Sequence, residues 1–460
     1  MKFVTTDTVS TDCLSDLASA TISKKAEIIQ SFYERVAFHP SGIIYSMQHM
    51  DEHAVRPFTS ADFEGKYSMN FEKWRLKPDG PWDHVHNENS ITTSGIYLAS
   101  QCYRYMATHD DAALEQARKA FRSLELIFEM GVKDGRPGWM GKPYSWRLSD
   151  QTSPDQYLDA SWGMLAYHAI AAPVERKRIE AMFIAFADHW RAIDYTLSYF
   201  GHHWVVKNAT DSYNLILVML NAIAYRFSRS EVHLNEARRF RSQGAWNRET
   251  NIDLIKCDRL NHGGFRPGLE TAFKDVLKEN EAICWEANIH CKYAVIAIEN
   301  ILAVAPELIQ DDAEGAFTRF FKIWRYGVGD DLMPYYWYAI DAANDTWRPL
   351  PKTDQLPKDQ WLFGHPLLSY LSQIRWMDPL ARFMYTAVVA AKRAPAVAIE
   401  ARSLAVRILE KVDARRLRWM VDPDGKQLIP EIGYAGEVLS SEVAPTFLAA
   451  YWRGRLEKLW

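Results

Sequence analysis

The sequence predicts an all-α protein folded as an (α/α) toroid of about six helical hairpins, with long loops over a central cavity. Three observations predict this fold. Helical periodicity covers most of the chain from about Ser94 onward, the helices follow one another in pairs, and the two members of several pairs differ in apolar character.

Eleven segments carry apolar residues at helical spacing over a length typical of helices. They are 94–108, 111–130, 156–171, 175–199, 211–227, 231–241, 281–304, 311–326, 366–376, 379–392 and 396–413. Strand signals are weak, and we expect one short hairpin near Trp419–Ile429 that turns at Asp424-Gly425. These elements predict an N-terminal arm, residues 1–30, and a single toroidal domain, residues 31–460.

The pairs alternate between helices that are apolar all round and helices with a charged side. Residues 215–224 (LILVMLNAIA) and 294–303 (AVIAIENILA) are almost wholly apolar, whereas the segments that follow them carry charge on one side. An apolar helix must be buried and an amphipathic helix faces water, so the alternation indicates two concentric rings. An α-solenoid is the competing architecture, but the sequence has no repeat of fixed length.

Composition narrows the functional classes. The chain has 460 residues and a formal net charge of −4, from 54 Lys and Arg against 58 Asp and Glu, which disfavours a nucleic-acid or anionic-membrane binder. Mean hydropathy is −0.28, and we expect no membrane span and no secretory signal. Five cysteines without a C-x-x-C pair fit a reducing, cytoplasmic compartment. The 17 Trp, 22 Tyr and 21 Phe suit a large core and also the stacking of sugar rings.

Four long stretches, 39–93, 131–155, 244–270 and 328–365, resist helix assignment and are rich in Gly, Pro, Trp, His and Asp. Such connections are usually functional in a compact domain. The richest motif runs from Gly138 to Tyr157, where Ser153, Pro154 and Gln156 predict a capped helix start and Asp155 lies in the first turn. Its upstream loop supplies the candidate site residues Tyr144, Trp146, Arg147 and Asp150.

A second motif, Trp82 to Ser90, contains His84, His86 and Glu88 at alternate positions. Two histidines and a carboxylate can bind a metal, but no other spacing signature supports one, so we predict no metal site. The alternative of a capped polar loop remains open. We expect His86, Glu88 and Asn89 to contact substrate at the rim of the cavity.

Two further motifs place polar groups beside apolar helices. The third motif contributes His202, His203 and Asn214, which we interpret as substrate contacts, with a solvated turn as the alternative for the histidines. In the fourth, Glu286, His290 and Tyr293 follow helical spacing and share one face of one helix. They are predicted to face the cavity, and a structural Glu–His pair in the core is the alternative.

The sequence lacks the Walker A, G-x-G-x-x-G, G-x-S-x-G and H-E-x-x-H motifs, and no cofactor is predicted. Helix pairs over about 85–455, Glu88-Asn89 followed by Gly95–Ala99, Asp155-Gln156-Tyr157 and Trp162-Gly163 resemble the six-hairpin toroid superfamily. The resemblance implies a carbohydrate-active enzyme, because that superfamily includes glycoside hydrolases, polysaccharide lyases and sugar epimerases.

Three functions follow as hypotheses. The first is hydrolysis of an oligosaccharide or glycoside by paired carboxyls, for which Asp150, Asp155, Glu88 and Glu286 are the candidates. The second is a uronate lyase or epimerase with a Tyr or His base. Its candidates are Tyr144, Tyr293, His202, His203, Asn214 and Arg147. The third is a non-catalytic helical binding protein. The sequence leaves the sugar, the linkage and the oligomeric state open.

Overall fold

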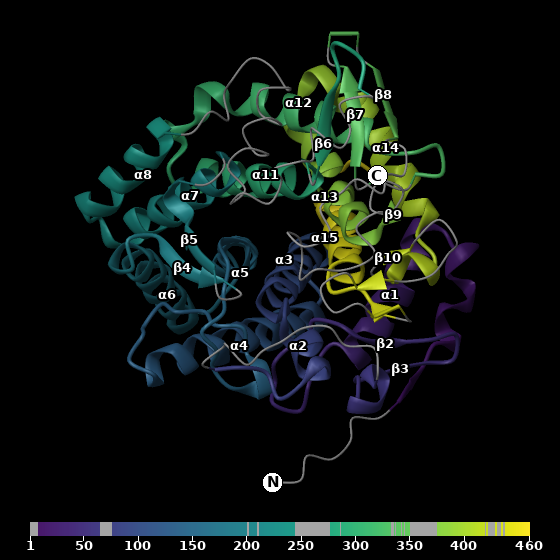
Figure 1. Cartoon of the computed structure of the whole chain (residues 1–460), viewed down its shortest axis with the longest axis horizontal. Coiled ribbons are helices and arrows are strands. Elements are labelled where there is room, and N and C mark those ends of the chain that lie inside the picture. The colour runs from purple at the N-terminus through teal and green to yellow at the C-terminus, as the bar shows by residue number, and fades with distance from the viewer. Residues whose placement is uncertain are drawn as a thin grey trace.

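Six mostly buried helices form a closed inner ring in the part of the chain that the structure describes (Figure 1). The computed structural model describes residues 8–64, 76–199, 202–208, 211–243, 277–285, 287–332, 335, 337–341, 343–344, 346–349, 375–418, 420–421, 428–429, 434–435 and 438–460. The inner helices are α3 (Ser90–Thr108), α5 (Pro154–His168), α7 (Asp211–Ser228), α11 (Ala287–Val304), α13 (Met377–Arg393) and α15 (Val443–Leu456). Each contacts the next, and α15 contacts α3.

Six outer helices in the described residues cover this ring. They are α1 (Ile22–Val36), α4 (Asp111–Lys133), α6 (Pro173–Ala192), α8 (Glu231–Gln243), α12 (Gln310–Tyr326) and α14 (Ala398–Lys411). The N-terminal α1 contacts the C-terminal α15, so the two ends of the chain form the sixth hairpin. The predicted domain boundary at residue 30 falls inside α1, whose Ala26, Ile29 and Phe32 belong to the hydrophobic core.

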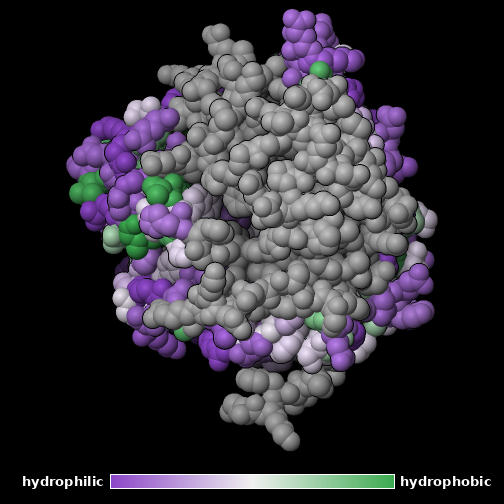
Figure 2. All heavy atoms as spheres, viewed as in Figure 1, coloured by the Kyte–Doolittle hydropathy of each residue, from purple (hydrophilic) through white to green (hydrophobic). Residues whose placement is uncertain are grey.

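The burial of the two rings follows the alternation in the sequence. In α3 every residue from Ser90 to Tyr103 is buried, whereas α4 buries residues at helical spacing, among them Ala113, Ala117 and Leu124. Amphipathic outer helices therefore separate the inner ring from water. Around the edge of the face in Figure 2, the described surface is mostly hydrophilic. None of the described helices is long and apolar enough to span a membrane.

All six inner helices run in the same direction, because an outer helix returns the chain between one inner helix and the next. Their N-termini therefore meet at one end of the rings, and the connections that precede them lie at that end. These connections contain the short helix α2 (Pro81–Asn87) before α3 and the hairpin of β4 (Thr196–Tyr199) and β5 (His202–Val205) before α7.

The remaining strands are short. A four-stranded sheet has the order β1 (Val9–Ser10), β3 (Ala54–Arg56), β2 (Gln48–Met50), β13 (Val438–Leu439), and a three-stranded sheet has the order β6 (Ala282–Trp285), β7 (Trp337–Asp341), β8 (Thr346–Pro349). Two antiparallel pairs join β9 (Arg375–Trp376) to β10 (Met420–Val421) and β11 (Leu428–Ile429) to β12 (Tyr434–Ala435). The first sheet links the N-terminal segment to the segment that leads into α15.

Several predicted element bounds were wrong. The helix predicted over 175–199 ends at Ala192, because Asp194 and Tyr195 take positive φ angles of 49° and 53° and redirect the chain into β4. Residues 282–285 of the predicted helix 281–304 form β6 instead, paired with β7. Residues 420–421 and 428–429 do form strands, but they pair with β9 and β12 rather than with each other.

The predicted helix 366–376 is tested only at its end. Residues 366–374 lie outside the described residues, and Arg375–Trp376 is a strand. Gln156 also differs from the prediction, because its side chain does not complete a capping box. Its amide instead accepts a hydrogen bond from the Thr92 N–H and donates to the Asn89 side chain, which ties α5 to α3.

Two glycines allow α3 and α5 to approach closely. A Cβ atom at Gly95 would lie 2.1 Å from the Asp159 carbonyl oxygen, and one at Gly163 would lie 2.3 Å from the Gly95 carbonyl oxygen. Real Cβ atoms cannot come that near, so larger residues would push the two helices apart. This close contact fixes where Asp159 lies along the axis of α3.

Candidate active site

Four charged side chains form a buried cluster among the inner helices, hereafter the charged quartet: Asp159, Lys292, Arg382 and Glu442. Lys292 Nζ lies 3.0 Å from Asp159 Oδ2 and 3.3 Å from Glu442 Oε2. Arg382 donates to both Glu442 oxygens, at 2.9 Å from Nε and 2.5 Å from Nη2. The residues are between 1% and 7% exposed, so water screens none of these charges effectively.

Each member of the quartet comes from a different inner helix or its start. Asp159, Lys292 and Arg382 lie in the second turns of α5, α11 and α13, and Glu442 is the N-cap residue of α15. The Ser440 hydroxyl accepts hydrogen bonds from the Glu442 and Val443 N–H groups. The preceding strand β13 pairs with β2, so the sheet holds this helix start in place.

The two carboxyls of the quartet have pKa values shifted in opposite directions. Burial raises the pKa of Asp159 to about 7, with Lys292 opposing the shift and the Glu442 charge adding to it. Burial alone would raise the pKa of Glu442, but Arg382 and Lys292 lower it to about 2. Among the described residues, the buried Asp159 Oδ1 atom has no hydrogen-bond partner. The quartet thus combines a carboxyl that can hold a proton near neutral pH with a carboxylate that cannot.

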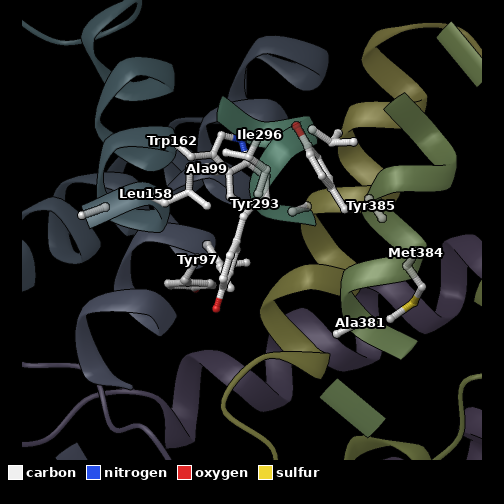
Figure 3. Close-up of a cluster of buried hydrophobic side chains, with 14 of the residues drawn as sticks. Tyr97, Ala99, Leu158, Trp162, Tyr293, Ile296, Ala381, Met384 and Tyr385 are labelled. Carbon is white, nitrogen blue, oxygen red and sulfur yellow. The ribbon is translucent and has the colours of Figure 1, made fainter. Parts of the chain in front are cut away.

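Asp155 and Tyr293 lie beside the quartet. Asp155 is half-buried in the first turn of α5, one helical turn before Asp159, and its charge contributes to the raised pKa of Asp159. Tyr293 is buried next to Lys292 on α11. Burial, and after it the Asp155 charge, raises the pKa of the Tyr293 phenol well above its ordinary value. In Figure 3, Tyr293 lies between side chains from α3, α5 and α13.

A network of polar side chains lies between the inner helices, farther toward their C-termini than the quartet. The Tyr103 hydroxyl accepts from Trp162 Nε1 at 2.8 Å and lies 3.1 Å from the Tyr385 hydroxyl. Tyr385 also donates to Glu299, which forms an ion pair with Arg453 at 3.2 Å. These contacts join α3, α5, α11, α13 and α15 through polar side chains.

Glu88 lies at the start of α3 in a second buried network. The Tyr144 hydroxyl donates to Glu88 Oε2 at 2.5 Å, His84 Nε2 lies 2.9 Å from the same oxygen, and Lys142 bonds the other oxygen. Burial opposes ionisation of Glu88, but the Lys142 and His84 charges hold its pKa well below the ordinary range. Glu88 is therefore a permanent carboxylate, unsuited to proton donation.

The loop that carries Trp146 is held in an unusual conformation. Ser145 and Trp146 both have positive φ, at 52° and 59°. The Ser145 N–H and hydroxyl both donate to Asp83. The Trp146 ring stacks on His39 with the ring centroids 3.6 Å apart.

His86 is buried nearby, and its Nε2 accepts from the Phe58 N–H at 2.7 Å. Burial lowers its pKa to about 3, so the ring is neutral at physiological pH. His84 and His86 thus each make a protein contact, and among the described residues no group of three His, Cys, Asp or Glu side chains is placed to hold a metal ion.

Other predicted site residues lie on the loop before α5, on β5 and on α7. Asp150 forms an ion pair with Arg136 at 3.1 Å, and Arg147 forms an exposed ion pair with Asp79 at 2.5 Å. His203 is exposed on β5. Asn214 is buried near the start of α7, and its Oδ1 atom has no partner among the described residues.

Three predicted site residues have no described side chain. Glu286 lies outside the described residues, and His202 and His290 are described only as backbone, in β5 and α11. Asn89 accepts a hydrogen bond from Gln156, as noted above.

Comparison with known structures agrees with the two rings of helices. A D-mannose isomerase superposes over 97% of this chain and 99% of its own length, with 10% identity and a TM-score of 0.50. The chain is an (α/α)6 toroid.

Two further solved structures align with this toroid. An unsaturated glucuronyl hydrolase specific for heparin has 12% identity and a TM-score of 0.48, over 95% of this chain and 98% of that one. A cellobiose 2-epimerase from Spirochaeta thermophila has 11% identity and a TM-score of 0.48, over 96% of this chain and 99% of that chain. No protein-family model and no curated protein sequence matches the chain.

Sequence reasoning missed the quartet of this toroid, although a signal for it existed. Lys292 lies two residues before the apolar run at 294–303, and Asp159 and Arg382 lie within inner helices that are otherwise largely apolar. A charge on a helix that must be buried requires an opposite charge. Buried charge on an inner helix thus points to Asp159, Lys292 and Arg382 as much as to Glu286 and His290.

Proposed function

We propose that this protein is a carbohydrate-active enzyme that hydrolyses the glycosidic bond of an oligosaccharide or glycoside. The observation that carries the proposal is Asp159, a buried carboxyl with a pKa of about 7 and one oxygen without a partner among the described residues. General acids that work near neutral pH have carboxyl groups shifted in this way. The aligned D-mannose isomerase is named for its action on a sugar, which supports a sugar substrate for this protein.

In the proposed reaction Asp159 donates its proton to the glycosidic oxygen as the bond to the anomeric carbon breaks. Asp155, one turn nearer the helix N-terminus and so on the same side of the sugar, accepts a proton from a water that adds to that carbon once the leaving group has departed, and the water oxygen forms the new bond. Transfer of that proton back to Asp159 completes the cycle. Lys292 and Glu442 act on the pKa of Asp159, Lys292 holds its carboxyl in position, and Arg382 holds Glu442.

The other predicted catalytic residues have different roles in this proposal. Glu88 bridges Lys142, His84 and Tyr144, and so orients the loop before α5. Asp150 holds the same loop through Arg136. Neither carboxylate is required to transfer a proton.

Sugar isomerisation or epimerisation is the second candidate, and one observation favours it. Asp155 and Asp159 lie one turn apart on the same helix, so both approach a substrate from the same side. That arrangement suits moving a proton between neighbouring carbon atoms, with Asp159 as the base. It suits less well the attack of water from the face opposite a proton donor.

Isotope labelling separates these reactions. The purified protein is incubated with panels of neutral and uronate-containing di- and trisaccharides and free sugars, once in H2¹⁸O and once in D2O. Hydrolysis predicts smaller sugars with ¹⁸O at the new reducing end. Isomerisation or epimerisation predicts a product of unchanged size, with carbon-bound deuterium where the moved proton exchanges with solvent. A lyase predicts an unsaturated uronate. Absence of every product in all panels would contradict a carbohydrate-active enzyme.

A further inference from the structure

Three aromatic rings form a continuous series between the β4–β5 hairpin and the charged quartet. Trp204 lies on β5, with its ring centroid 5.2 Å from that of Tyr213 and nearly perpendicular to it. The Tyr213 ring is 6.0 Å from the Tyr293 ring. We call these three residues the aromatic strip. They come from β5, α7 and α11, so tertiary packing brings them together.

The two ends of the aromatic strip differ in exposure, and charged side chains lie near the Tyr293 end. Trp204 is half-buried, whereas Tyr213 and Tyr293 are 6% and 5% exposed. Tyr293 directly follows Lys292 on α11, and Lys292 lies 3.0 Å from Asp159 in the quartet, so the Tyr293 end of the strip adjoins the residues proposed to act on the sugar. The hairpin precedes α7 and lies at the N-terminal end of the inner ring. The strip thus leads from the partly exposed rim to the proposed site of proton transfer.

Aromatic rings bind the flat C–H faces of sugar rings, and the Tyr hydroxyl and Trp N–H can serve their polar groups. We propose that the aromatic strip binds the sugar units next to the reacting bond, so that the preferred substrate has at least two sugar units. This inference rests on the proposed function only for the identity of the ligand as a carbohydrate. It assigns Trp204 and Tyr213 as substrate-binding residues.

The test compares ligands of different length on matched tryptophan variants. Dissociation constants are measured for maltotriose, cellotriose, mannotriose and xylotriose, each beside the methyl glycoside of its own monomer. The variants are Trp204→Ala and Trp204→Phe, with Trp347→Ala as control. Trp347 is also half-buried on a short strand and perpendicular to a tyrosine, Tyr338, at 6.0 Å. The Tyr338 hydroxyl bonds the Ile323 carbonyl on the outer helix α12, so this pair belongs to a different part of the fold.

We expect at least one trisaccharide to bind wild type more tightly than its methyl glycoside. Trp204→Ala should weaken binding of that trisaccharide about 3- to 10-fold, the range expected for one aromatic stacking contact. Trp204→Phe should retain most of the affinity, and Trp347→Ala should match wild type. Methyl glycoside binding should change little in all three variants.

Three outcomes would overturn the inference: no trisaccharide binds, Trp204→Ala binds it as wild type does, or Trp347→Ala loses as much affinity. Should Trp204→Ala fail to fold, judged by its far-UV circular dichroism, the Trp204→Phe and Trp204→Leu pair provides the same comparison. Because the readout is binding, an inactive protein that still binds trisaccharides through Trp204 contradicts the proposed function and leaves the strip supported.

Discussion

Replacing Asp159 with Asn should change how the stability of the protein depends on pH. The pKa of Asp159 is raised from 3.8 to about 7 in the folded protein. The folded state therefore keeps a proton on Asp159 between about pH 4 and pH 7, where the unfolded state has lost it. The group contributes stability that is fully present below pH 3.8 and lost as the pH rises through 7.

The size of the effect on the free energy of unfolding depends on how much of the Asp159 pKa shift lies within the pH range of the experiment. Between pH 5 and pH 8, wild type loses the proton over about two pH units, and each unit is worth about 1.4 kcal/mol. Wild type should thus lose about 3 kcal/mol of this contribution, while the Asp159→Asn variant loses none. Glu442 titrates in its own window, from 4.5 down to about 2, and does not interfere above pH 5.

Buried histidines act with the opposite sign and must be separated from Asp159. Burial lowers the pKa of His39 and His189 to about 4 and that of His86 to about 3. They make the folded state more stable as the pH rises toward 6.5. All three are the same in both proteins, so the difference between wild type and variant isolates Asp159.

The assay is chemical denaturation of wild type and Asp159→Asn at pH 5, 6, 7 and 8. The free energy of unfolding of the variant, relative to wild type, should rise by about 3 kcal/mol across this range. A difference that stays constant with pH would mean that Asp159 is ionised throughout. It would refute the role of this residue as a proton donor near neutral pH.

Two further predictions concern the packing around the quartet, each with a matched control. Gly95→Ala should lower the free energy of unfolding by about 1–3 kcal/mol, because its Cβ would meet the Asp159 carbonyl. The control Gly315→Ala, on the outer helix α12, meets only the flexible Arg319 side chain and should be neutral or stabilising by up to about 1 kcal/mol. Equal effects of the two variants in denaturant titrations would contradict the close α3–α5 contact. Glu442→Gln should lower the free energy of unfolding by about 3–5 kcal/mol, because it leaves Arg382 buried without its full partner. The control Glu400→Gln breaks a partly exposed pair with Arg325 and should cost less than about 1 kcal/mol. Similar melting temperatures for the two variants would contradict the burial of the quartet.

The ring architecture could be predicted because it depends on properties that each segment carries by itself. An inner helix such as α7 has nine apolar residues among the ten at 215–224, and an outer helix such as α8 is polar on one side, so burial follows from the sequence of each. The sixth hairpin could not be predicted in this way. It joins α1 to α15, at opposite ends of the chain, and no local pattern specifies that contact.

Strand pairing was predicted less well for a related reason. The apolar residues near Ile429 do form a strand, but its partner is set by tertiary packing rather than by the Asp424-Gly425 turn signal. The turn after α6 depends on the positive φ angles of Asp194 and Tyr195. Glycine at these positions would have predicted such a conformation, whereas Asp and Tyr do not.

The candidate site was only partly predictable from residue types. Asp155 was identified from its place at a helix start, and it lies beside the quartet. Asp150 looks similar in the sequence, yet it forms an ion pair with Arg136 on the loop. What distinguishes the two is the set of neighbours from distant segments, such as Lys292 and Tyr293, and spacing along one segment does not contain that information.

The most direct test of the central claim is the turnover number of Asp159→Asn on a sugar substrate of the wild-type enzyme. Asn keeps the size of the side chain and can still hydrogen-bond, but it cannot donate or accept the proton. We predict that kcat falls at least about 100-fold, with the variant folded as judged by circular dichroism and by its melting temperature. A folded variant with wild-type kcat would contradict proton transfer by Asp159, and with it the assignment of the charged quartet as the catalytic centre.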